Sequence, residues 1–289
     1  MSVALLEVAR HFQLLRLHIT LQLTEDTQLP AFKGSMWHGW LGQALKAVDE
    51  RVYATLYGQH AVQQPKPYVI CPNEDLKKQW CKYELLSFEL LLIGEAASLA
   101  PRVLEALEYG QILGLGEQRT PAVLLSVCSQ LPGRYRPGLH PTLLAEWLYP
   151  QPTLEPIEVA LQLQTPMRWK FNGQIQQPQA FPLDVWIRHI QRRIKLLGTF
   201  WVADQPELYN RLYLDLPRMS DYEVQHYLYF EDWQRYSAVS DGMLPFGGVK
   251  GQISYQGEIS EVLPWLQAGE VLHLGGKTTF GLGKYRLLA

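Results

Sequence analysis

The chain repeats itself at a long interval. Residues 103–116 read VLEALEYGQILGLG and residues 262–275 read VLPWLQAGEVLHLG, with seven of the fourteen positions identical. The second stretch begins 159 residues after the first (262 minus 103). Because solenoid repeats recur at roughly 20–50 residues, this interval predicts a duplicated domain of about half the chain instead.

Both halves begin with the same order of patterns. Residues 12–23, FQLLRLHITLQL, alternate apolar and polar side chains, which is typical of a strand with one buried face. Helical spacing of apolar residues follows over 32–48. In the second half, residues 157–163 alternate in the same way and an amphipathic helix is predicted over 181–201. Each half is therefore expected to run strand, helix, strands, helix, strand.

This order predicts the α+β class, with two tandem duplicated ferredoxin-like (βαββαβ) domains. In each, an antiparallel sheet would carry its helices on one face. The segment LYPQPTLEP, residues 148–156, contains three prolines and is expected to be the linker. The predicted domains are residues 1–150 and 151–289, with a cleft between them.

Composition excludes several classes of function. A net charge of −2 gives no global attraction to nucleic acid or to an anionic membrane, although a local basic patch can still exist. Cys71, Cys81 and Cys128 are odd in number and lack CxxC spacing, which disfavours a disulfide framework and a zinc site. No apolar stretch approaches about 18 residues. We expect a cytoplasmic protein with no cofactor, no metal and no membrane partner.

Residues 269–288, GEVLHLGGKTTFGLGKYRLL, are rich in glycine. Glycine permits positive φ, and successive N–H groups in such a turn can form a concavity for phosphate oxygens. Lysine and threonine side chains within the segment add charge and hydroxyl donors. The alternative is a glycine hairpin that only packs closely against the sheet. The phosphate-contacting candidates here are His273, Gly275, Gly276, Lys277, Thr278, Thr279, Gly281 and Gly283.

A second basic stretch lies between residues 165 and 200. It holds six lysines and arginines against one acidic residue, Asp184. Arg188, Arg192 and Lys195 recur at i, i+4 and i+7 and would share one helix face, which phosphates favour. A solvated helix face remains the alternative. The six basic residues are Arg168, Lys170, Arg188, Arg192, Arg193 and Lys195.

The C-terminal region resembles a known family. GGVKGQISYQGEI (247–259) and LPWLQAGEVLHLGGKTTFGLGKY (263–285) are similar to the glycine-rich end of CRISPR-associated precursor-RNA endoribonucleases, which belong to the RAMP superfamily. Residues 29–47, 113–125 and 165–170 resemble the same family in the expected order. The resemblance implies tandem ferredoxin-like folds and metal-independent cutting of CRISPR repeat RNA. The RNA 2′-hydroxyl would attack the adjacent phosphate, leaving a 5′-hydroxyl and a 2′,3′-cyclic phosphate.

Such a reaction needs a base for the 2′-hydroxyl, an acid for the leaving 5′-oxygen and positive charge at the phosphate. His38 is the leading catalytic candidate, beside Lys33, because histidine can serve either proton step. It stands in His38-Gly39, where relatives usually have Arg-Gly. His18 and His60 compete for the role, and a hydrogen-bonded structural histidine remains the alternative for His38.

The resemblance also extends the set of expected RNA contacts. Arg235, in a W-x-R-x-S pattern, joins Arg168, Lys170, the basic helix face and the glycine-rich candidates. A structural role facing the duplicated sheet remains the alternative for Arg235. The expected partner is CRISPR repeat RNA, with a CRISPR effector complex as a further partner and the oligomeric state left open. Two other functions also stay open: a non-catalytic RNA-binding subunit of an effector complex, and a module that binds a small molecule or a protein.

Overall fold

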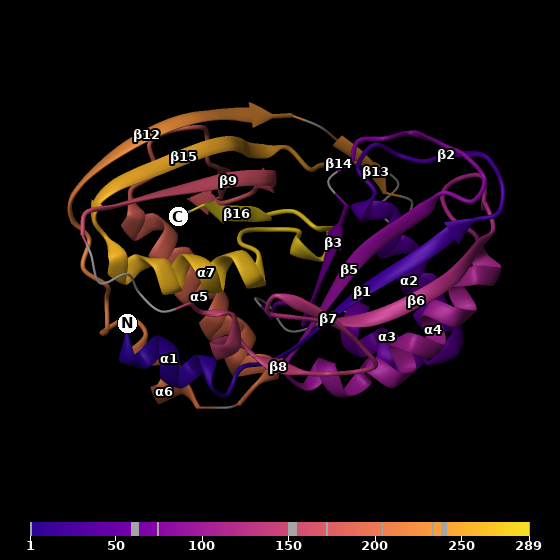
Figure 1. Cartoon of the computed structure of the whole chain (residues 1–289), viewed down its shortest axis with the longest axis horizontal. Coiled ribbons are helices and arrows are strands. Elements are labelled where there is room, and N and C mark those ends of the chain that lie inside the picture. Colours follow the sequence, from indigo (N-terminus) through magenta and orange to yellow (C-terminus); the bar gives the residue numbers. More distant parts are fainter. Residues whose placement is uncertain are drawn as a thin grey trace. The chain divides into compact units, whose positions relative to one another are not determined.

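The computed structural model describes residues 2–58, 64–73, 75–149, 155–171, 173–203, 205–232, 234–237 and 242–288. The chain divides into two compact units (Figure 1). The N-terminal unit comprises Arg10–Glu146 and Leu196–Asp204, and the C-terminal unit comprises Met1–Ala9, Trp147–Lys195 and Gln205–Ala289. The units therefore exchange two short segments, which a division into residues 1–150 and 151–289 does not anticipate.

The N-terminal unit is built on an antiparallel sheet in the order β3-β5-β1-β6-β7, with β8 paired to β1. Helix α2 connects β1 to β3 and α4 connects β5 to β6, which is the βαββαβ order of a ferredoxin-like fold. The strands are β1 (Gln13–Leu23), β3 (Tyr68–Pro72), β5 (Leu85–Ile93), β6 (Ala122–Leu131), β7 (Arg134–Pro137) and β8 (Thr142–Leu143). The helices are α2 (Gly34–Val48), α3 (Glu50–Tyr57), η1 (Gly94–Leu99), α4 (Ala100–Leu113) and η2 (Leu144–Trp147), and β2 (Thr27–Gln28) pairs with β4 (Gln79–Trp80).

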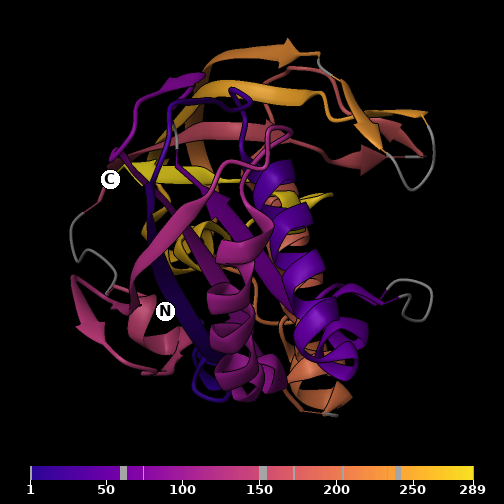
Figure 2. The same ribbon diagram turned by 90° about the vertical axis from the view of Figure 1, so that its right-hand side faces the viewer.

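Alternation along β1 explains how this unit is packed. One face buries Leu15, Leu17, Ile19, Leu21 and Leu23, whereas Arg16 and His18 lie on the other face. Helices α2 and α4 run side by side against the buried face (Figure 2). Between them, the Trp40 Nε1–H donates to the Gly110 carbonyl at 2.8 Å. A Cβ at Gly110 would lie 2.3 Å from the Trp40 ring, so glycine allows the two helices to approach.

The C-terminal unit has the same topology, with an antiparallel sheet in the order β12-β15-β9-β16. Helix α5 connects β9 to β12 and α7 connects β15 to β16, and both lie on one face of the sheet (Figure 1). The strands are β9 (Ile157–Met167), β12 (Ser220–Glu231), β15 (Gly248–Glu258) and β16 (Tyr285–Leu288), with hairpins β10 (Lys170–Phe171)–β11 (Gln174–Ile175) and β13 (Gln234–Ser237)–β14 (Gly242–Pro245). The helices are α1 (Val3–Ala9), α5 (Leu183–Trp201), α6 (Pro206–Arg211), η3 (Ser260–Val262), α7 (Leu263–Leu272) and η4 (Thr278–Phe280).

The sequence repeat coincides with equivalent elements of the two units. Residues 103–116 contain most of α4 and residues 262–275 contain α7. Directly after these helices, Gly114 and His273 adopt φ values of 66° and 54°, and Gly116 and Gly275 adopt 69° and 82°. The predicted α+β class and the tandem ferredoxin-like fold are confirmed.

Among the described helices, none is both long and apolar enough to cross a membrane.

Candidate functional site

The glycine-rich loop, residues 273–284, connects α7 to β16 in the C-terminal unit. Gly275, Gly281 and Gly283 adopt positive φ, and so does Lys277, at 64°. A Cβ at Gly283 would lie 1.7 Å from the Leu274 carbonyl oxygen, so only glycine fits there without displacing the backbone. Local sterics therefore account for part of the glycine content.

Hydrogen bonds inside the unit already use several loop amides. The N–H groups of Gly276, Gly281 and Gly283 donate to the carbonyl oxygens of Arg168 (3.0 Å), Thr278 (2.9 Å) and Pro166 (3.1 Å). The prediction that these glycine amides are open to phosphate is wrong in this conformation, because each already has an acceptor. The exposed part of the loop is the Gly275–Gly276 turn, beside the half-buried side chains of Lys277 and Thr279.

Three of the expected RNA contacts in this region are buried. Arg168 is 8% exposed; its Nη1 donates to the Gly247 carbonyl, and burial lowers the pKa of its guanidinium. His273 is fully buried, and Thr278 is 6% exposed. We therefore correct the prediction for these three residues: their side chains support the loop from inside the unit and do not face solvent.

Arg193 on α5 forms hydrogen bonds with both ends of the Gly275–Gly276 turn. Its Nε and Nη2 lie 3.3 and 3.2 Å from the Leu272 carbonyl oxygen, and Nη2 donates to Thr278 Oγ1 at 3.1 Å. Burial lowers the pKa of Arg193 to about 10, so the group remains charged at neutral pH. Arg193 is one of the six basic residues between 165 and 200, and the sequence pattern predicted no separate role for it. Its position between the face with Arg188 and Arg192 and the apolar face was the available signal.

The basic face of α5, which we define as Arg188, Arg192 and Lys195, presents charge to solvent. Arg188 is 67% exposed and pairs with Asp184 one turn earlier. Arg192 is exposed, while the Lys195 Nζ donates to Asn210 Oδ1 at 2.8 Å. The predicted helical stripe is thus present.

Two expected contacts lie on hairpins of the C-terminal unit. Lys170 is exposed on β10. Arg235 lies on β13, where its backbone pairs with Leu244, and its side chain is outside the described part of the structure.

His38 lies on α2 of the N-terminal unit and is half-buried. Its ring centroid is 4.7 Å from that of Tyr57 and 6.3 Å from that of Tyr68. The Tyr57 hydroxyl donates to the His38 carbonyl at 2.9 Å, and burial raises the pKa of that hydroxyl above its ordinary value. A Cβ at Gly42 would lie 2.7 Å from the Tyr57 ring, so glycine lets Tyr57 pack against α2. The imidazole is therefore held by aromatic packing and is still partly open.

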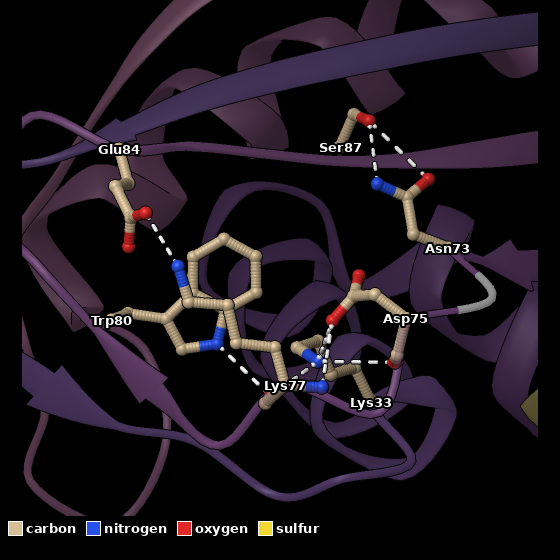
Figure 3. Close-up of polar contacts among 7 residues, drawn as sticks. All are labelled: Lys33, Asn73, Asp75, Lys77, Trp80, Glu84 and Ser87. Atoms are coloured by element: carbon tan, nitrogen blue, oxygen red, sulfur yellow. Dashed lines mark hydrogen bonds and ion pairs between the residues drawn. The ribbon is translucent and has the colours of Figure 1, made fainter.

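Lys33 occupies a different environment from the one predicted. It is 1% exposed, and its Nζ lies 2.7 Å from Asp75 Oδ1, 3.0 Å from the Lys77 carbonyl oxygen and 5.1 Å from the centroid of the Trp80 ring (Figure 3). These contacts attach the 75–80 segment to the start of α2. Lys33 is accordingly removed from the catalytic candidates, because its ammonium group is enclosed and already bonded.

The two competing histidines are placed differently. His18 lies on the polar face of β1 between Glu89 of β5 and Cys128 of β6, and its ring is 5.2 Å from that of Tyr135. Its Nδ1 is buried and has no hydrogen-bond partner among the described residues. His60 lies outside the described residues. The described residues also contain no group of three or more His, Cys, Asp and Glu placed to hold a metal ion.

Comparison with protein families places most of the chain. Residues 161–285 match the family model of the CRISPR-associated endoribonuclease Cas6, and residues 12–140 match a model described as an N-terminal domain. The Cas6 match, over residues 161–285, includes α5, its basic face and the glycine-rich loop. Comparison with curated proteins found no match.

Solved structures with a similar fold include Cas6 proteins. A Cas6 product complex superposes with a TM-score of 0.59 at 18% identity, covering 96% of this chain and 99% of that one. Thermus thermophilus Cas6 gives 0.57 at 15% identity, with the same coverage. A chain of a partial Cas6-RT-Cas1–Cas2 complex gives 0.63 at 15% identity, and this chain spans about half (46%) of its length.

Proposed function

We propose that this chain is a CRISPR-associated, RAMP-fold repeat-RNA processing protein with a Cas6 endoribonuclease domain. In this proposal it cuts CRISPR repeat RNA without a metal ion. The observation that carries the proposal is the Cas6 match over residues 161–285, which contains the basic face of α5 and the glycine-rich loop. The products would be guide RNAs with a 5′-hydroxyl and a 2′,3′-cyclic phosphate.

In the proposed reaction the 2′-oxygen forms a bond to the adjacent phosphorus, and the bond from phosphorus to the 5′-oxygen breaks. The 2′-hydroxyl loses a proton and the leaving 5′-oxygen gains one. His38 acts as the general acid–base group, because its imidazole is half-buried on α2 and a histidine side chain can serve either proton step. Among the four predicted catalytic residues, Lys33 is enclosed by its contacts with Asp75 and Lys77.

RNA binding is assigned to the exposed cations of the C-terminal unit. Arg188 and Arg192 on α5 and Lys170 on β10 would contact phosphates, and the exposed Gly275–Gly276 turn would let the strand approach the backbone. Each phosphate contact releases counterions, so affinity should fall steeply with salt. Arg235 keeps its predicted contact as a part of this proposal.

The test is cleavage of a repeat RNA in excess EDTA by the full chain and its His38→Ala variant. We expect cleavage by the unaltered protein, no cleavage of RNA with a 2′-deoxy scissile nucleotide, and a rate about 10²–10⁴-fold lower for the variant. His226→Ala, on the exposed part of β12, is the matched control and should cleave normally.

Four results would overturn or revise the proposal. A strict need for a divalent cation, or cleavage of the 2′-deoxy RNA, would contradict the chemistry. Tight binding of repeat RNA with no cleavage by any form would favour a non-catalytic RNA-binding subunit. Loss of cleavage on replacing His18 with normal activity of His38→Ala would transfer the catalytic role to His18.

A further inference from the structure

We propose that Arg193 is a positioning residue for RNA binding: its guanidinium fixes the shape of the glycine-rich loop without touching the RNA. The inference rests on the proposed function, because it concerns how that function's RNA-binding loop is held. Nothing in the family match assigns this residue a role.

The contacts of Arg193 span the base of the exposed turn. Its Nε and Nη2 both donate to the carbonyl oxygen of Leu272, the last residue of α7, and Nη2 also donates to Thr278 Oγ1. Gly275 and Gly276 lie between these two acceptors along the chain and are exposed. One rigid planar group therefore sets the separation between the two ends of the turn.

Arginine suits this position for two reasons. The C-terminal carbonyls of a helix carry partial negative charge and favour a nearby cation. A guanidinium also offers several donors in a fixed plane, whereas a lysine ammonium is a single point on a flexible stem. In the described part of the chain Arg193 forms no ion pair with a carboxylate, so its hydrogen bonds to the loop are its main polar contacts.

The turn has a second support on its other side. Gly276 donates its N–H to the Arg168 carbonyl at 3.0 Å, and Gly275 packs so close to that residue that a Cβ would lie 2.8 Å from the same oxygen. Loss of Arg193 would leave the turn held on the Arg168 side alone. The expected result is a loop that samples more conformations, which weakens binding by requiring the RNA to order it.

Arg192 is the matched control, since it is the preceding residue on α5 and is exposed. The experiment measures the dissociation constant of a 2′-deoxy repeat RNA over a range of KCl for the full chain and for Arg193→Gln, Arg193→Lys and Arg192→Gln. Amide hydrogen exchange of residues 274–283 is measured on the same proteins without RNA.

We expect Arg193→Gln to bind about ten- to a hundredfold more weakly, from the loss of charge-assisted hydrogen bonds, with an unchanged salt slope. Arg193→Lys should recover part of the affinity. Arg192→Gln should reduce the slope of log K against log salt by roughly 0.7–0.9, the effect of one lost phosphate contact. Exchange of the loop amides should accelerate in Arg193→Gln and stay unchanged in Arg192→Gln.

A reduced salt slope in Arg193→Gln would overturn the inference, because it would mean direct phosphate contact. Unchanged affinity and unchanged exchange would overturn it as well. If the unaltered protein binds no repeat RNA, the proposed function fails, while the exchange data still decide whether Arg193 holds the loop. If Arg193→Gln does not fold, Thr278→Val removes one acceptor only; it should weaken binding severalfold and accelerate exchange, and normal values for both would contradict the inference.

Discussion

The rings of Trp169 and His189 stack almost parallel, with centroids 4.4 Å apart and planes inclined by 8°. Burial, with smaller contributions from Arg192 and Arg188, lowers the pKa of His189 to about 4. Because this is below the value of about 6.5 in the unfolded chain, unfolding takes up a proton between pH 6.5 and 4. The stabilisation from neutral His189 is therefore complete above pH 6.5 and is lost as the pH falls to 4.

His189→Phe should keep the ring stack and remove this titration. Between pH 7 and pH 4, the free energy of unfolding of the unaltered protein should fall by about 3 kcal/mol more than that of the variant. Urea unfolding at several pH values measures the difference. Parallel curves for the two proteins would show that His189 is not the group responsible.

Two helical glycines should respond in opposite ways to alanine. Around Gly39 no atom lies within 4 Å of an added Cβ, so Gly39→Ala should stabilise α2 by about 0.5–1 kcal/mol. At Gly110 the added Cβ would be 2.3 Å from the Trp40 ring, and Gly110→Ala should cost about 1–3 kcal/mol. Chemical denaturation measures the free energy of unfolding of both variants. A Gly110→Ala variant as stable as the unaltered protein would refute the close packing of α2 on α4.

The glycine-rich loop offers a second matched pair. Gly283→Ala places a Cβ 1.7 Å from the Leu274 carbonyl at a positive φ, so we expect a loss of about 2 kcal/mol or more. Gly276→Ala has its nearest neighbour at 3.8 Å and should change stability by less than about 0.5 kcal/mol. If RNA approaches the exposed turn, Gly276→Ala should nevertheless weaken RNA binding. Urea unfolding of both variants measures the steric role of glycine, and the dissociation constant of repeat RNA for Gly276→Ala, measured by filter binding, tests access of the RNA to the turn.

Lys33→Met tests the enclosed ammonium group. The substitution removes the ammonium donor that Asp75 and the Lys77 carbonyl share, so the free energy of unfolding should fall by about 1–3 kcal/mol. Well below the unfolding midpoint, cleavage at saturating RNA should stay within about twofold of normal. A stable variant that had lost cleavage would return Lys33 to the catalytic candidates.

Local periodicity was sufficient to predict the first long strand and the first long helix of each ferredoxin-like repeat. The strand predicted over 12–23 is β1, and the helices predicted over 32–48 and 181–201 are α2 and α5 with ends shifted by about two residues. These predictions succeed because side-chain alternation and helical spacing depend only on neighbours in sequence. The repeat predicted the tandem topology because it places equivalent glycines, Gly116 and Gly275, three residues after the ends of α4 and α7.

The site was harder to predict because its contacts are distant in sequence. Arg193 reaches Leu272 over 79 residues, and Lys33 reaches Asp75 over 42. Whether a basic side chain meets solvent or a carbonyl depends on helix rotation and strand register, which composition does not specify. For that reason Arg168 and Arg188, both read as RNA contacts, have opposite environments: one is enclosed under the loop and the other is exposed.

The segments that the two units exchange limit how this protein can be dissected. A fragment ending at the proline-rich linker would lack residues 196–204, and with them Trp201, whose Nε1–H donates to the Pro65 carbonyl at 2.7 Å and whose own carbonyl packs on Gly94. The complementary fragment would lack residues 1–9, where Ser2 and Ala4 bind the Asp215 carboxylate at 2.8 Å. Each half expressed alone would thus lack a segment that its own unit packs against, so cutting the chain at the linker yields neither unit intact.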